Sequence, residues 1–222
     1  MMRILALLLL VMPLVEGREI VFYLLNPLKD CPREVYLVGP KMSLPVDLPT
    51  RNFSEDYDLP PGDLTLALMR KPLEEGEIVP ASAPKITLPM TMKRAAVILV
   101  PSTKNAQMPV RPILVDLSSM KNGSAIFYNF SNNRVFGDLG GEKMHISPRG
   151  TYTMNTSKMS GATFPVEISC LKPGGQEPVP MISAYWKSYP KHRQFTFIVD
   201  VPNRPAPVVK TILEFEAPPT EE

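Results

Sequence analysis

The stretch IVFYLLN, Ile20 to Asn26, decides the fold because a similar stretch, AIFYNFS, begins about a hundred residues later at Ala125. After each one, a short polar segment leads to a valine followed by an aromatic residue, Val35-Tyr36 in the first case and Val135-Phe136 in the second. A similarity that returns at a fixed offset is the mark of an internal duplication.

Two further pairs continue the series in the same order. LPPGDLTL from Leu59 resembles ISPRGTYT from Ile146, each a turn that feeds an alternating strand. KRAAVILVP from Lys93 resembles HRQFTFIV from His192. Any two strands look somewhat alike, but four matches in one order at offsets near 100 favour a tandem repeat.

The apolar residues come in short runs that are rich in Val, Ile, Phe, Tyr and Thr and are bounded by Pro, Gly and Asn. Such runs predict strands, and beyond the first residues no helical apolar period persists. The chain is therefore expected to be all-β, with two tandem antiparallel β-sandwich domains of about seven strands, immunoglobulin-like or transthyretin-like. We place the first domain at residues 18–119, the second at 120–217 and a disordered tail at 218–222.

The chain opens with MMRILALLLLVMPLVEGRE, in which Arg3 precedes an apolar run from Ile4 to Val15. This pattern predicts a signal peptide over residues 1–17, since the run is too short to span a bilayer. An uncleaved anchor or a disordered leader is the alternative. We expect a secreted or periplasmic protein with no integral membrane span after leader removal.

The net charge and the number of cysteines limit the partners and cross-links that can be expected. The net charge is +2, and removal of residues 1–17 leaves it unchanged because Arg3 and Glu16 cancel, so nothing favours nucleic acid. No cofactor is expected. An exported chain permits a disulfide between Cys31 and Cys170, while two buried free thiols are the equal alternative.

The glycine-rich stretch FGDLGGEKMHISPRGTYTM, Phe136 to Met154, looks at first like a catalytic loop. Gly140-Gly141 leads into a strand and not into a helix, which argues against a phosphate-binding loop. Alternation predicts that His145 points outward beside Lys143 while Met144 faces the core. Pro148 fixes φ and Gly150 tolerates a positive φ, so we interpret the whole stretch as a bend.

Catalytic and metal sites have weak signals. His145 and His192 are the only histidines, and the chain has neither a G-x-S-x-G nor an H-E-x-x-H motif. Residues 55–58 (EDYD) offer Ca²⁺ ligands, and Met90, Met92 and the Met144-His145 pair offer ligands for Cu(I), yet an acidic loop and core-filling methionines explain them more simply.

The best candidate ligand surface is SAYWKSYPKHR, which contains Tyr185, Trp186, Lys187 and Tyr189. Aromatic faces beside cations suit sugar rings and acidic polysaccharides, although we favour the simpler interpretation that Trp186 is the core tryptophan of a sandwich. We therefore expect an exported, non-catalytic binding or structural element of the cell envelope or extracellular space, whose partner is a protein or a polysaccharide. A carbohydrate-binding accessory module is the alternative, and a hydrolase or metal-dependent enzyme ranks third.

Overall fold

The computed structural model describes residues 17–102, 108–156, 163–201 and 203–215, so the predicted tail and all but the last residue of the predicted leader lie outside the described residues. The first eight strands are β1 (Arg18–Leu24), β2 (Glu34–Gly39), β3 (Met42–Asp47), β4 (Tyr57–Leu59), β5 (Leu64–Met69), β6 (Lys85–Leu88), β7 (Arg94–Pro101) and β8 (Val110–Asp116). The next eight are β9 (Ser124–Asn129), β10 (Arg134–Leu139), β11 (Glu142–Ile146), β12 (Thr151–Asn155), β13 (Thr163–Leu171), β14 (Val179–Lys187), β15 (Arg193–Val199) and β16 (Val208–Glu214).

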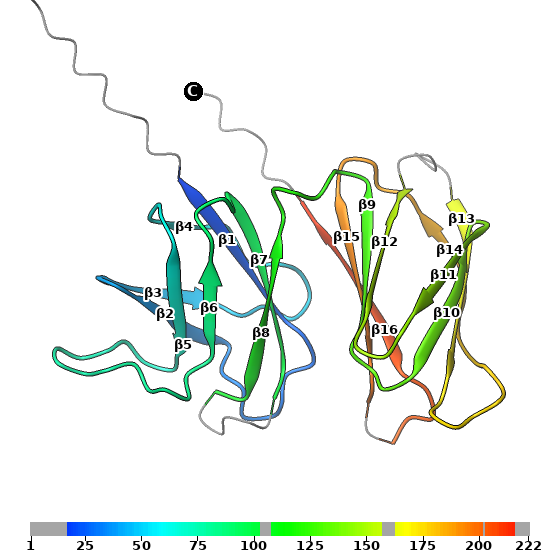
Figure 1. Ribbon diagram of the computed structural model, residues 1–222, viewed down its shortest axis with the longest axis horizontal. Coiled ribbons are helices and arrows are strands. Elements are labelled where there is room, and N and C mark those ends of the chain that lie inside the picture. Colours follow the sequence, from blue (N-terminus) through cyan, green and yellow to red (C-terminus); the bar gives the residue numbers. More distant parts are fainter. Residues whose placement is uncertain (1–16, 103–107, 157–162, 202, 216–222) are drawn as a thin grey trace, which may run out of the picture.

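Each set of eight strands forms two four-stranded sheets. The strand orders are β4-β1-β7-β8 and β3-β2-β5-β6 in the first domain, and β12-β9-β15-β16 and β11-β10-β13-β14 in the second. The second pair of orders is the first pair with eight added to every strand number. The prediction of an all-β chain with two tandem sandwiches is confirmed, and the two domains lie side by side in Figure 1.

The pairing within the sheets differs from the expected antiparallel pattern in one respect. β1 pairs with β7 in parallel, and β9 pairs with β15 in parallel, while the other pairs are antiparallel. Parallel neighbours need a long crossover, which the strands of the other sheet provide here. Since β1 and β2 lie in different sheets, the order differs from the immunoglobulin order, in which the first two strands share a sheet, and favours the transthyretin-like alternative.

Three of the four sequence matches join equivalent strands, and one is wrong. The matches of β1 with β9, β2 with β10 and β7 with β15 agree with the strand orders. Residues 59–66, however, run from the end of β4 into β5, whereas residues 146–153 run from the end of β11 into β12, the equivalent of β4. The two turns share proline and glycine, which specify a turn but not the strands that it joins.

The four sheets stack as layers, because the two middle sheets are buried on both faces. In β1, Ile20, Phe22 and Leu24 pack into the core of the first domain, while the alternate side chains pack toward the second domain. The second domain has its own core between its two sheets. The cluster between the domains, here called the interdomain core, contains Val21, Tyr23, Leu25, Phe53, Ala96, Ile98, Val100, Val115, Leu117, Tyr128, Phe195, Phe197, Val199 and Ile212.

Aromatic rings fill the centre of the interdomain core. Tyr23 of the first domain stacks on Phe197 of the second, with ring centroids 5.3 Å apart and planes at 13°. Phe53 meets Phe195 edge to face at 5.2 Å. Burial raises the pKa of Tyr128 to about 12, because a phenolate there would lose its hydration. The two domains therefore share one continuous apolar interior.

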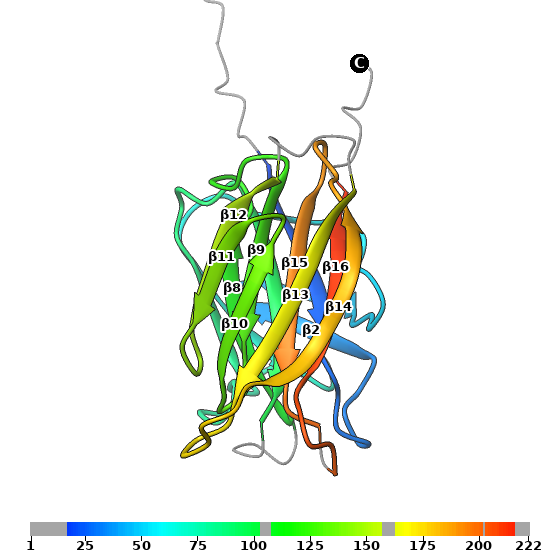
Figure 2. The ribbon, with the colours of Figure 1, turned by 90° about the vertical axis from the view of Figure 1, so that its right-hand side faces the viewer.

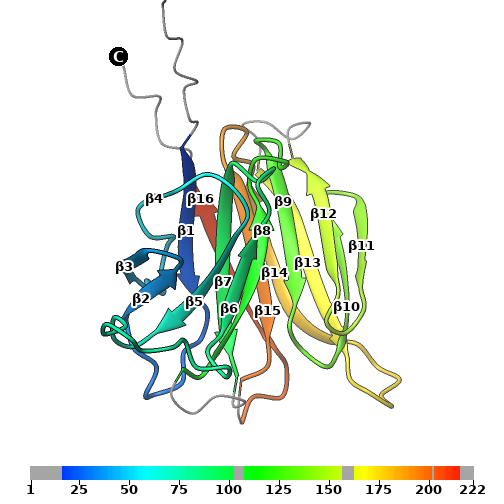
Figure 3. The ribbon, with the colours of Figure 1, turned by 60° about the vertical axis from the view of Figure 1, so that its left-hand side comes forward.

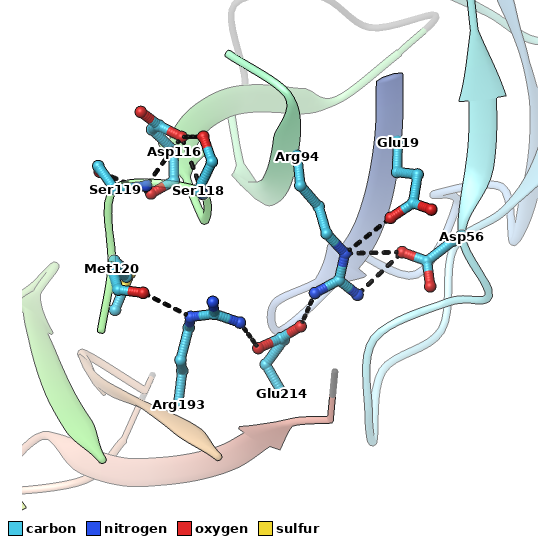
Figure 4. A network of polar contacts seen from close by, with 9 residues as sticks. All are labelled: Glu19, Asp56, Arg94, Asp116, Ser118, Ser119, Met120, Arg193 and Glu214. Carbon is cyan, nitrogen blue, oxygen red and sulfur yellow. Dashed lines mark hydrogen bonds and ion pairs between the residues drawn. The ribbon is translucent and has the colours of Figure 1, made fainter. Parts of the chain in front are cut away.

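A buried ion cluster, the arginine clamp, closes one end of the interdomain core (Figure 4). Glu214 of β16 is 1% exposed and pairs with two guanidinium groups, Arg94 of β7 in the first domain and Arg193 of β15 in the second, the latter at 2.8 Å. Arg94 also binds Asp56 at 2.9 Å and Glu19 at 3.1 Å. Burial alone would lower the pKa of Arg94, but the charges of Glu214 and Asp56 outweigh it and raise that pKa.

The clamp uses both copies of a duplicated arginine but only one carboxylate. Arg94 and Arg193 both begin the central parallel strand of their sheet. Arg193 is paired in register with Glu214, while the carbonyl of Arg94 accepts a hydrogen bond from the N–H of Leu117 at 2.9 Å. Leu117 thus occupies in the first domain the position that Glu214 occupies in the second. The single carboxylate of Glu214 pairs with both arginines.

We expect Phe197→Ala to lower the free energy of unfolding by about 3–5 kcal/mol, because it opens a cavity in the interdomain core. Urea unfolding followed by circular dichroism measures the loss. The control is Phe215→Ala, the same substitution at a side chain that is 60% exposed. Equal effects of the two substitutions would contradict the shared interior.

Glu214→Gln should cost about 3–5 kcal/mol, since it leaves two buried guanidinium groups without their common counter-charge. Glu75→Gln, at an exposed loop position, should stay within about 0.5 kcal/mol of the parent protein. Urea midpoints at constant slope give both values. If Glu214→Gln were as mild as Glu75→Gln, the clamp would contribute no stability.

Candidate functional site

The predicted aromatic strip is divided between the two faces of β14. Tyr185 is 76% exposed, and Lys187 is exposed as well. Trp186 points the other way, is half-buried and stacks on Phe127 with ring centroids 6.2 Å apart and planes at 3°. Tyr189 follows the strand, with the Nζ of Lys187 6.0 Å from its ring centroid. The four residues do not form a single platform, and Tyr185 alone presents its ring to the outer side.

Tyr185 belongs to a larger polar and aromatic surface, the outer face of the second domain, which is the solvent side of the sheet β11-β10-β13-β14 (Figure 2). Side chains alternate along these strands, so Val135, Leu139 and Val166 enter the core while their neighbours point out. The outward set on the four strands includes Arg134, Phe136, Asp138, Lys143, His145, Pro165, Glu167, Ser169, Ser183, Tyr185 and Lys187.

The most specific feature of this outer face is a pair of stacked rings. Phe136 and His145 are directly opposite each other in register, with centroids 4.8 Å apart and planes at 6°. Arg134 extends over the same phenyl ring, with its guanidinium carbon 6.0 Å from the centroid. Phe136 is half-buried and His145 exposed, so the two rings, stacked face to face, present a rigid and partly apolar ridge to solvent.

Charged groups lie in the next row along the strands. Lys143 on β11 donates to Asp138 on β10 at 2.6 Å, and Asp138 is in register with Glu167 on β13, which is in register with Ser183 on β14. The hydrogen bond from Lys143 lowers the pKa of Asp138, and the backbone N–H of Gly141 lowers it further. Carboxylates and hydroxyls with free lone pairs therefore flank the stacked rings, and these groups accept and donate hydrogen bonds to polyols.

The outer face is hollowed around these residues. A shallow depression of about 770 Å³ is lined by Phe136, His145, Asp138, Lys143, Glu167 and Ser183, among others. Tyr185 lies two strands away from Phe136 and two outward-facing positions further along the strand direction. The spacing of strands and the rise per residue place the two side chains roughly 17 Å apart. Two aromatic positions at this spacing, with polar groups between them, make an extended site and not a small-molecule pocket.

The glycine-rich stretch both bends the chain and builds this site. Gly140 and Gly141 have φ of 63° and 94° and form the β10–β11 turn, as the bend interpretation predicts. Because two residues make the turn, Phe136 and His145 at equal distances on either side of it must face each other. The prediction that His145 points outward while Met144 is buried is confirmed. Sequence reasoning missed that Phe136 joins His145, although the symmetric turn signals it.

The other residues considered for metal binding or catalysis do not come together in the structure. Met144 and His145 lie on opposite faces of β11, so they cannot share a metal ion, and Asp56 is engaged by Arg94. His192 lies between Tyr189 and Phe215, with ring centroids at 6.1 and 4.6 Å. In the described part of the chain, neither histidine hydrogen-bonds a serine, a cysteine or a carboxylate.

Another cavity, of about 570 Å³, lies in the first domain beneath the β5–β6 connection, on the side that Figure 3 brings forward. Its lining is largely apolar and includes Leu73, Pro80 and the 88% exposed Ile78. The charged groups at this cavity already have partners, because Lys71 pairs with Glu77 at 3.4 Å and Arg70 donates a hydrogen bond to the Asp30 carbonyl at 2.8 Å. The outer face of the second domain is the better-equipped site because its rings and charged groups are presented together.

The two cysteines are free thiols in separate cores. Cys31 is buried in the core of the first domain and Cys170 in that of the second, with both middle sheets between them. Packed sheets are about 10 Å apart, whereas a disulfide requires Cα atoms within about 7 Å, so Cys31 and Cys170 are not paired in this structure. Desolvation raises the pKa of each thiol, which lowers its reactivity.

No family model matches the chain, and no curated protein matches it. No helix among the described residues has the length and apolar character needed to cross a bilayer.

We expect both thiols to be unreactive toward Ellman's reagent in the native protein, because each is buried and protonated. Two thiols per chain should react when the protein is unfolded in denaturant without a reductant. A matched sample that is reduced before unfolding is the control. More thiols in the reduced sample would reveal a disulfide and contradict the separation of the two cores.

Proposed function

We propose that this protein is an exported, non-catalytic binding protein of the cell envelope or extracellular space, and that the outer face of the second domain binds polysaccharide. The stacked pair of Phe136 and His145 carries the proposal, because it forms a rigid, partly apolar ridge against which the C–H groups of a pyranose can pack. Export is inferred from the leader pattern at residues 1–17.

The groups around the rings support a saccharide as ligand. Hydroxyls of a sugar need both donors and acceptors, which Lys143, Asp138, Glu167 and Ser183 supply at the rim of the same depression. Tyr185, roughly 17 Å from Phe136, provides a second ring for a later unit of the same chain. An extended, shallow site suits a polymer that is held along its length.

The absence of catalysis is also part of this proposal. A hydrolase needs a nucleophile or a general base held in reach of the substrate. On the outer face, the ring of His145 is fixed by stacking and Asp138 is paired with Lys143, so both are arranged for binding. Recognition by a rigid surface is the mechanism that these residues support.

Phe136→Ala should lower the affinity for a bound polysaccharide by about tenfold or more, since it removes half of the apolar ridge and the ring that holds His145 in place. The measurement is a panel of envelope and extracellular polysaccharides in affinity gel electrophoresis, followed by calorimetry with the best ligand. Phe136→Tyr, which keeps the ring, should retain binding.

The matched control is Tyr36→Ala, because Tyr36 in β2 of the first domain corresponds to Phe136 in β10 of the second. Its affinity should stay within about twofold of the parent protein. The saccharide proposal fails if no polysaccharide in the panel is retained, or if Phe136→Ala and Tyr36→Ala bind equally well.

A further inference from the structure

A small cavity lies on the seam between the domains, where β1, β7, β9 and β15 end. This seam pocket has a volume of about 270 Å³. Its apolar lining comes from both domains and consists of Leu25, Val100, Phe130 and Val199. The pocket is therefore an extension of the interdomain core toward solvent, at a site that exists only because the two domains are packed together.

The apolar lining is made of equivalent positions from the two domains. The N–H of Leu25 donates to the carbonyl of Leu99 at 2.9 Å, and the N–H of Phe130 donates to the carbonyl of Ile198 at 2.8 Å. These are the same hydrogen bond in the two copies of the fold, and Val100 and Val199 are the next residues along β7 and β15. The duplication thus provides a symmetric floor.

The charged residues of the seam pocket break this symmetry. Arg111 in β8 is paired with Val100, whereas Val208 in β16 is paired with Val199, so an arginine stands in one copy and a valine in the other. Asp200, next to Val199, accepts hydrogen bonds from the Asn132 backbone at 3.1 Å and the Asn133 side chain at 3.2 Å. The guanidinium of Arg111 makes no hydrogen bond or ion pair to any residue in the described part of the chain.

The second arginine of the seam pocket, Arg149, is held in a strained backbone conformation. Gly150 N–H donates to the Ser147 carbonyl at 2.9 Å, which closes a turn with Pro148 and Arg149 at its centre. The positive φ of 63° falls on Arg149, so the prediction that Gly150 carries it is wrong. Gly150 is needed for room instead, because a Cβ there would lie 3.0 Å from the Ser147 oxygen.

A left-handed arginine is uncommon, and such strain gathers at binding and switch positions. Glycine or asparagine would occupy this turn position at lower cost. The guanidinium of Arg149 is fixed by a hydrogen bond from its Nη2 to the Asn132 side chain at 3.0 Å. The chain therefore accepts a strained turn and, with it, places a positioned guanidinium at the seam pocket.

We propose that the seam pocket binds a small organic anion whose carboxylate is held by Arg111 and Arg149 and whose body rests on the apolar floor. A guanidinium group binds a carboxylate with two parallel hydrogen bonds. The pocket is lined by two guanidinium groups and one carboxylate, that of Asp200, so it keeps a net positive charge. A volume of about 270 Å³ admits a compact molecule but not a length of polymer. This site shares no residue with the proposed saccharide surface, so either proposal stands or fails without the other.

The test titrates the full chain with benzoate, acetate and inorganic phosphate at constant ionic strength, using thermal unfolding and calorimetry. Benzoate should raise the Tm in a saturable way and more than acetate, since only benzoate has a body that reaches the apolar floor. Arg111→Gln and Arg149→Asn should each weaken benzoate binding by about tenfold or more. Arg33→Gln, at an exposed position on the far side of the first domain, is the matched control and should bind as the parent does.

Arg149→Asn separates loss of binding from loss of folding. Because asparagine tolerates a positive φ, this variant should have a higher Tm than the parent without ligand, while it loses the benzoate response. The proposal is overturned if no probe raises the Tm beyond the effect of chloride at equal ionic strength. Retained benzoate binding in either Arg111→Gln or Arg149→Asn also overturns it, and stronger binding of phosphate than of benzoate would indicate an inorganic anion site only.

Discussion

The contact between the two middle sheets is the interaction on which the rest of the structure depends. Each middle sheet has a face that a solitary sandwich would expose to water, and here Tyr23 and Phe197 close those faces against each other. The chain thereby becomes a four-layer body with only two open sheet faces, one at each side (Figure 1). Surface recognition must then use those outer faces, the loops or the ends of the seam, and both proposed sites lie in such places.

The duplication explains why the two domains have the same strand order. Positions at which the two copies differ in charge indicate where function is expected. Arg94 and Arg193 are retained in both copies, but the carboxylate that joins them, Glu214, replaces the apolar Leu117 of the other copy. At the opposite end of the same interface, Arg111 replaces the equivalent of Val208. Desolvation makes a buried charge costly at an apolar seam, and this cost falls on Glu214, which is buried, and not on the exposed Arg111. The clamp offsets this cost by pairing, whereas the seam pocket leaves Arg111 available.

Much of the fold could be predicted from the sequence, since alternating β-branched and aromatic runs with proline and glycine turns define strands locally. The doubly buried middle sheets were also signalled, because AAVILV at 95–100 is an uninterrupted apolar run, which is typical of strands covered on both faces. What covers the second face could not be predicted, because such a run specifies burial but not a partner.

The candidate site was predictable only in part, for reasons of register. His145 was expected outside and lies there, and the two-residue turn at Gly140-Gly141 determines that it faces Phe136. The orientation of β14 was undetermined, because alternation assigns Tyr185 and Trp186 to opposite faces without saying which face is the core. Packing decides it, since the flat indole stacks on Phe127 inside the sandwich while the Tyr185 hydroxyl stays in water.

Rigidity is the property that joins the interior of this molecule to its proposed activity. A shallow site on an outer sheet makes few contacts per ligand unit, so its affinity depends on how little order must be created on binding. The Phe136 and His145 rings are already stacked, Asp138 is already paired, and the sheet beneath them packs on a domain that is itself fixed to its neighbour. The interdomain core and the clamp lie in other layers than the outer face, yet they keep that face preorganised, because a sheet that cannot shift holds its side chains in one arrangement.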